Sequence, residues 1–164
     1  MVIEISRQEL KWNTIKFVNK SLFKKIMINT LNRFAYFNKI SEIELSILLT
    51  DDCNITQLNK NFRNKDKPTN VLSFPDTELS HWQDILAFES DLHYIYLGDI
   101  AFSYQTIMEE SCAQGKTFKN HFIHLCVHSI LHLIGFDHDE DKNAEIMELT
   151  EVEILKNFAI YNVY

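Results

Sequence analysis

The stretch HLCVHSILHLIGFDH, residues 124–138, is the part of the sequence that is most informative about the fold. It belongs to a strongly apolar run that is predicted to form a helix over residues 117–134. Gly135 suits the end of that helix, because glycine can adopt the left-handed conformation that reverses the chain. The residues that follow are therefore brought back over one helix face.

Three histidines of this stretch predict a metal site. His128 and His132 lie four residues apart, so both imidazoles project from one helix face, and the turn at Gly135 brings His138 to the same place. Three neutral imidazoles suit Zn²⁺ and leave a fourth tetrahedral position for water, as in catalytic sites. We therefore expect one zinc ion per chain. The alternative is that these are core histidines held by hydrogen bonds.

Two further histidines precede these on the same predicted helix. His124 lies one turn before His128 on the same face, and we expect it to support the site from behind or to belong to the core. His121 is expected to be exposed. Neither is predicted to bind the ion, since three histidines and a water fill a tetrahedral site.

The histidine spacing matches the metzincin protease pattern H-E-x-x-H-x-x-G-x-x-H, except at one position. Ser129 stands where the protease has its general-base Glu, and a serine hydroxyl cannot take a proton from the attacking water at neutral pH. The pattern thus indicates a metal site and argues against proteolysis.

The remaining sequence interleaves helical and strand patterns, which indicates an α+β fold. Strands are expected at 44–49, 71–74 and 94–102, and helices at 21–37, 53–62, 104–113 and 117–134, with a last helix capped by Asp139.

Length and composition fit one soluble domain over residues 1–164, with 46% apolar residues. A net charge of -7 would repel phosphate unless basic residues gather locally, so DNA binding is not expected. No stretch is typical of a membrane span or an export signal. Cys53, Cys112 and Cys126 are too far apart for a disulfide framework, and we expect buried thiols in a reducing cytoplasm.

Three segments together resemble the YbeY family of bacterial endoribonucleases. Residues 124–138 are similar to its H-L-x-V-H-G-x-L-H-L-x-G-Y-D-H, with Ser129 for Gly and Phe136 for Tyr. LNKNFRNKDKPTNVLSFP, residues 58–75, matches L-N-x-x-Y-R-x-K-D-x-P-T-D-V-L-S-F-P, with Asn70 for Asp, and LGDIAFS at 97–103 is like L-G-D-I-x-I-S. None of these substitutions falls on a proposed metal ligand.

The resemblance implies a metal-dependent, single-strand-specific endoribonuclease, a hydrolase that acts in ribosomal RNA maturation of the small subunit and in ribosome quality control. It implies a mixed four-stranded sheet packed with five or six helices, with the metal on a central helix. By position His128, His132 and His138 take the family's ligand roles, and Arg63 takes the place of its functionally important arginine. Its partners would be single-stranded ribosomal RNA, the small ribosomal subunit and the assembly factors of that subunit.

A basic loop supports an RNA substrate independently of the resemblance. It contains Lys60, Arg63, Lys65 and Lys67 in an otherwise acidic chain, so phosphate can bind there. We expect Arg63 and Lys65 to contact RNA and Arg63 to stabilise the transition state with its planar, permanently charged guanidinium. Solvated loop charges are the alternative for the lysines.

Two other functions remain open from sequence. One is a ribosome-assembly factor with a structural metal, and the other is a zincin-type metalloprotease, which the missing Glu disfavours. Asp137 could orient a ligand by hydrogen bonding or cap a helix.

Overall fold

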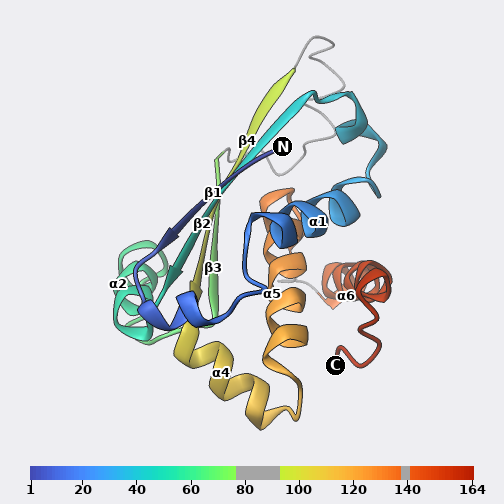
Figure 1. Cartoon of the computed structure of the whole chain (residues 1–164). Helices are drawn as coiled ribbons and strands as arrows, with labels where there is room; N and C mark the ends of the chain where they lie inside the picture. The colour runs from blue at the N-terminus through green and yellow to red at the C-terminus, as the bar shows by residue number, and fades with distance from the viewer. Residues whose placement is uncertain (77–92, 138–140) are drawn as a thin grey trace.

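The computed structural model describes residues 1–76, 93–137 and 141–164, and in them helices cover both faces of a mixed sheet (Figure 1). The α+β prediction is therefore confirmed. Along the chain the elements are β1 (Val2–Arg7), a 3₁₀ turn (Leu10–Thr14), α1 (Lys20–Leu31), a second 3₁₀ turn (Ala35–Lys39), β2 (Glu42–Thr50), α2 (Asp52–Arg63), β3 (Val71–Pro75), β4 (Tyr94–Ser103), α4 (Tyr104–Ala113), α5 (Phe118–Leu133), α6 (Asp141–Leu155) and a last 3₁₀ turn (Lys156–Phe158).

The sheet has the strand order β1-β2-β4-β3, with β1, β2 and β4 parallel and β3 antiparallel to β4. A β-bulge interrupts the β2–β4 pairing, where the single residue Leu45 of β2 lies opposite Leu97 and Gly98 of β4. The bulge shifts the side-chain alternation of β4 by one residue. As a result Leu97 and Ile100, three positions apart, are both buried in the main core.

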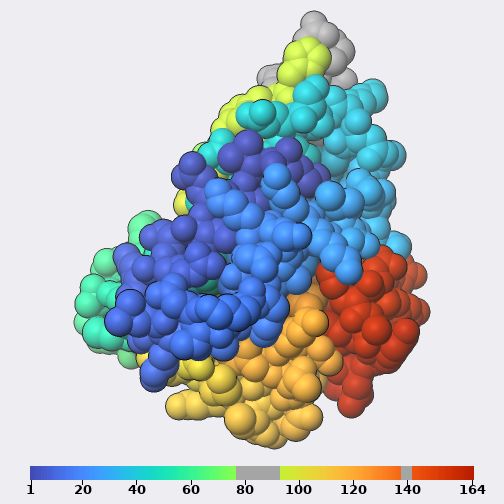
Figure 2. Space-filling view, viewed as in Figure 1, coloured from blue at the N-terminus to red at the C-terminus, as the bar shows by residue number. Residues whose placement is uncertain are grey.

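Helix α5 lies against the sheet, with α1 and α6 packed beside it (Figure 1). Thr117 caps its first turn by accepting a hydrogen bond from the Asn120 backbone. Phe122 of α5 is fully buried against Trp12 and Phe102, which join the helix to the N-terminal segment and to β4. Figure 2 shows the N-terminal segment in blue and α6 in red on either side of the visible part of α5 in orange.

Helix α2 covers the opposite face of the sheet, where Ile55 packs with Leu72 and Ala101 in a second, smaller core. Asp51 caps its start with a 2.8 Å hydrogen bond from the Asn54 backbone. Its end is closed by Asn64 in the left-handed conformation. Arg63, the last residue of α2, therefore lies where the loop to β3 begins.

Some expectations from sequence are wrong or incomplete. Strand β1 was not expected, and the helix expected over 21–37 ends at Leu31, where the chain turns before a short 3₁₀ segment. Cys126 is buried as expected, but Cys53 and Cys112 are exposed because they lie on the outer faces of α2 and α4. Asp139, expected to cap α6, lies outside the described residues. Within the described residues, no helix combines the length and apolarity needed to cross a membrane.

Candidate metal and RNA site

The paired histidines of α5 meet as their spacing predicts. The Nε2 atoms of His128 and His132 are 3.0 Å apart, and the two ring planes are nearly perpendicular at 86°. Both side chains are partly exposed, while the residues between them on α5 are all buried. The central helix therefore presents two imidazole nitrogens at one point of the surface.

The turn after α5 orients His132. Gly135 has φ 95°, and the Phe136 N–H bonds the Leu131 carbonyl while the Gly135 N–H bonds the His132 carbonyl, which together form a Schellman closure. This closure folds the Phe136 carbonyl back onto the helix, where it accepts a 2.9 Å hydrogen bond from His132 Nδ1. The predicted left-handed glycine is confirmed, and it holds the ring as well as ending the helix.

Glu151 of α6 holds the other ring of the pair. One of its oxygens accepts a 2.7 Å hydrogen bond from His128 Nδ1, and the other accepts a 2.7 Å bond from His124 Nε2. The Tyr164 hydroxyl also donates to this carboxylate, which is only 1% exposed. Burial alone would raise the pKa of Glu151, but these hydrogen bonds outweigh it and hold the pKa at about 2.

These contacts determine where the imidazole protons lie. An ionised carboxylate and a carbonyl oxygen only accept hydrogen bonds, so Nδ1 is the protonated nitrogen in both rings. In neutral rings both Nε2 atoms then carry lone pairs, 3.0 Å apart. The repulsion between two such lone pairs is relieved either by a proton shared between the rings or by a metal ion beside them. Two nitrogens bound to one tetrahedral zinc at about 2.0–2.1 Å lie roughly 3.3 Å apart, so this donor set fits a zinc-like ion.

The third expected ligand, His138, lies outside the described residues. Among the residues that the structure does describe, no group of three or more histidine, cysteine or carboxylate side chains is arranged to hold a metal. Asp137 is exposed and lines the same cavity as the histidine pair. Its two expected roles stay predictions.

Arg63 shares a cavity of about 780 Å³ with His128 and His132. The wall between them is formed by all five residues of β3, which run from the loop after α2 to a position beside α5. Sequence positions about 65 residues apart are thus brought to one cleft by the packing of α2, β3 and α5.

The lysines of the basic loop are placed differently from Arg63. Lys65 is exposed, and it is not among the described residues that line the cavity. Lys60 forms an exposed ion pair with Asp66 at 2.6 Å. The cavity therefore receives its positive charge from Arg63, while Lys65 stays a predicted RNA contact at the edge.

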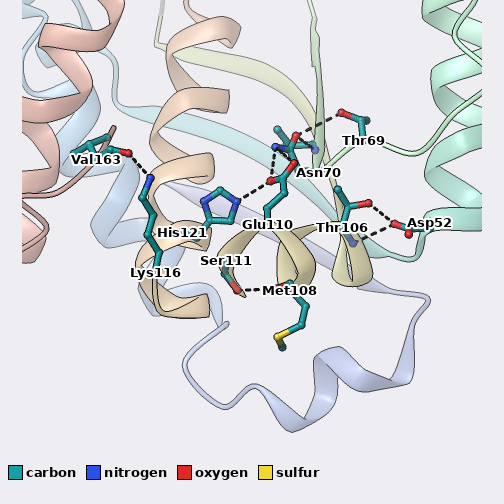
Figure 3. A network of polar contacts seen from close by, with 11 residues as sticks. Asp52, Thr69, Asn70, Thr106, Met108, Glu110, Ser111, Lys116, His121 and Val163 are labelled. Atoms are coloured by element: carbon teal, nitrogen blue, oxygen red, sulfur yellow. Dashed lines mark hydrogen bonds and ion pairs between the residues drawn. The ribbon is translucent and has the colours of Figure 1, made fainter. Parts of the chain in front are cut away.

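A polar network centred on Glu110 corrects the expectation for His121 (Figure 3). This histidine is 4% exposed, and its Nε2 lies 2.7 Å from Glu110 of α4, which also accepts from the Asn70 side chain. Burial acts to raise the pKa of Glu110, but the bonds from His121 and Asn70 outweigh it and lower the pKa. Because α4 supplies a carboxylate partner, the histidine can be buried where sequence predicted exposure.

Glu151 is the functional candidate that sequence reasoning missed. It comes from another helix, 23 residues after His128, and its own surroundings carry no motif. The only signal in the sequence was a carboxylate on the last predicted helix, among several others on that helix. His124 contacts this carboxylate, which agrees with its expected supporting role.

The fold and the site define an α+β protein with a mixed four-stranded sheet and a histidine-based polar centre on its central helix. The chain belongs to the YbeY family, since the family model described as Endoribonuclease YbeY matches residues 7–159.

A curated relative supports this assignment, and a solved structure is similar in fold. The Endoribonuclease YbeY of Rhodopseudomonas palustris (strain HaA2) is 46% identical over 123 residues, a match that covers 75% of this chain and 62% of the relative. The chain thus spans under two thirds of that relative's length. The solution structure of TM1509 from Thermotoga maritima is similar in fold, with a TM-score of 0.55 and 24% identity over 96% of this chain and 92% of the other.

Proposed function

We propose that this protein is a metal-dependent endoribonuclease that cuts single-stranded ribosomal RNA, in maturation of the small subunit and in ribosome quality control in the cytoplasm. Family membership supports the class of reaction. The observation that carries the metal dependence is the 3.0 Å approach of two Nε2 atoms whose rings both donate from Nδ1 to an acceptor.

The chain's own residues have distinct roles in this proposal. His128, His132 and His138 hold one zinc ion, which when bound supplies Lewis acidity at a phosphodiester. Arg63 lies in the same cavity and binds phosphate oxygens with its planar fork, so it stabilises the charge that develops as the bond breaks. Lys65 attracts the RNA strand from the cavity edge.

The position of Ser129 favours RNA over peptide as substrate. Its side chain is 0% exposed, and its hydroxyl has no hydrogen-bond partner among the described residues. The residue at the general-base position of the protease pattern therefore faces the core, where it cannot reach a substrate.

The test uses purified protein on one RNA sequence in single-stranded and duplex form, with and without a chelator. We expect chelator-sensitive cleavage of the single strand and little cleavage of the duplex. His132→Ala should lose most of its zinc by elemental analysis and most of its activity, while exposed His93→Ala should keep both. Zinc retained in full by His132→Ala would refute the ligand assignment. Zinc-loaded wild type that leaves RNA intact would instead favour a ribosome-assembly factor with a structural metal.

A further inference from the structure

We propose that Glu151 is a positioning residue that fixes the tautomer and orientation of His128, so that Nε2 faces the metal position beside His132. This inference rests on the metal role of His128 in the proposed function. Its basis is the 2.7 Å hydrogen bond from His128 Nδ1 to a carboxylate supplied by a different helix.

The Glu151 carboxylate is itself held in place from two further directions. His124 donates to its second oxygen at 2.7 Å, and the Tyr164 hydroxyl donates to that same oxygen. With both oxygens engaged and the residue 1% exposed, the carboxylate cannot rotate without breaking a buried hydrogen bond. His128 therefore meets a rigid acceptor, and its ring has one favoured orientation.

The two rings of the pair are oriented by different means. His132 is held by the Phe136 carbonyl, which the turn after α5 supplies locally, whereas His128 depends on α6 packing against α5. Removing the side chain of Glu151 should therefore affect His128 selectively. A residue that merely tied α6 to α5 would affect folding stability without changing which nitrogen of His128 carries the proton.

The first experiment needs no variant. Long-range ¹H–¹⁵N correlation spectra of the wild-type protein at pH 7.5, metal-free and after zinc addition, report the protonation of each imidazole nitrogen. We expect His128 to carry its proton on Nδ1 in both spectra. A His128 ring protonated only on Nε2 would overturn the proposal.

The second experiment compares Glu151→Gln with Glu148→Gln, an exposed glutamate on the same helix. We expect Glu151→Gln to weaken zinc binding by about 10- to 100-fold in competition with a chromophoric chelator and to lose the preference for Nδ1–H on His128. Glu148→Gln should stay within about twofold of wild type. Glu151→Asp keeps the charge on a shorter stem, so its affinity should lie between those of wild type and Glu151→Gln.

The outcomes separate this inference from the proposed function. Unchanged zinc affinity and an unchanged His128 tautomer in folded Glu151→Gln would overturn the positioning role and leave the nuclease proposal standing. A wild-type protein that shows the expected tautomer but binds no zinc would refute the metal role in the proposed function. The orienting hydrogen bond from His128 to Glu151 would still be supported.

Discussion

Replacing Gly98 by alanine should destabilise the wall of the Arg63 cavity. A β-carbon at this position would lie 2.1 Å from the Phe74 carbonyl oxygen and 2.9 Å from the Asp76 nitrogen, and contacts under 3.0 Å essentially never occur. Strand β3 would have to move by about 1 Å. The backbone there also has φ +128°, which only glycine adopts without strain. Backbone strain of about 1–3 kcal/mol and an overpacking cost of similar size together lower the free energy of unfolding by roughly 4 kcal/mol.

Urea denaturation followed by circular dichroism measures this loss. Gly115→Ala is the matched control, because Gly115 also has a positive φ of +63° but no atom lies within 4 Å of the place that its β-carbon would take. It should cost only about 1 kcal/mol. If the Gly98 variant lost no more stability than this control, the close approach of β3 to β4 would be refuted. Because β3 lines the cavity, RNA cleavage by any folded Gly98→Ala protein should fall as well.

Arg63→Glu should lower RNA cleavage by about 100- to 1,000-fold with zinc content and folding intact, and Arg63→Lys should recover it only partly, since lysine lacks the planar fork. Wild-type cleavage by the folded, zinc-loaded Glu variant would show that Arg63 is an ordinary solvated charge. Ser129→Gly should keep zinc binding and stay free of peptidase activity on casein. The reason is that it removes a buried hydroxyl that makes no hydrogen bond in the described structure. Chelator-sensitive casein cleavage would count against the RNase proposal. The lowered pKa of Glu110 predicts a stability contribution that is present above the ordinary pKa of 4.5 and lost as the pH falls through the lower folded-state value. Urea unfolding at pH 7 and pH 3.5 measures how much unfolding free energy each protein loses on acidification. This loss should be smaller for Glu110→Gln than for wild type or for the exposed Glu109→Gln. Equal losses in all three proteins would mean that the pair with His121 does not stabilise the fold.

Local patterns were enough to predict most elements of the fold. The apolar helix α5 and the left-handed Gly135 that ends it each depend on residues within a few positions, and the structure has both. Strand β1 was missed because VIEISR is short and mixes charges with apolar residues. Its strand character comes from pairing with β2, which is not encoded in the segment alone.

The sequence by itself determined that His128 and His132 share one helix face, because a four-residue spacing is only slightly more than one helical turn of about 3.6 residues. Only the tertiary structure decided what surrounds them. Packing of α6 on α5 brings in Glu151, and β3 brings Arg63 to the same cavity. These contacts join residues far apart in the chain, so they depend on how whole elements pack rather than on any local periodicity.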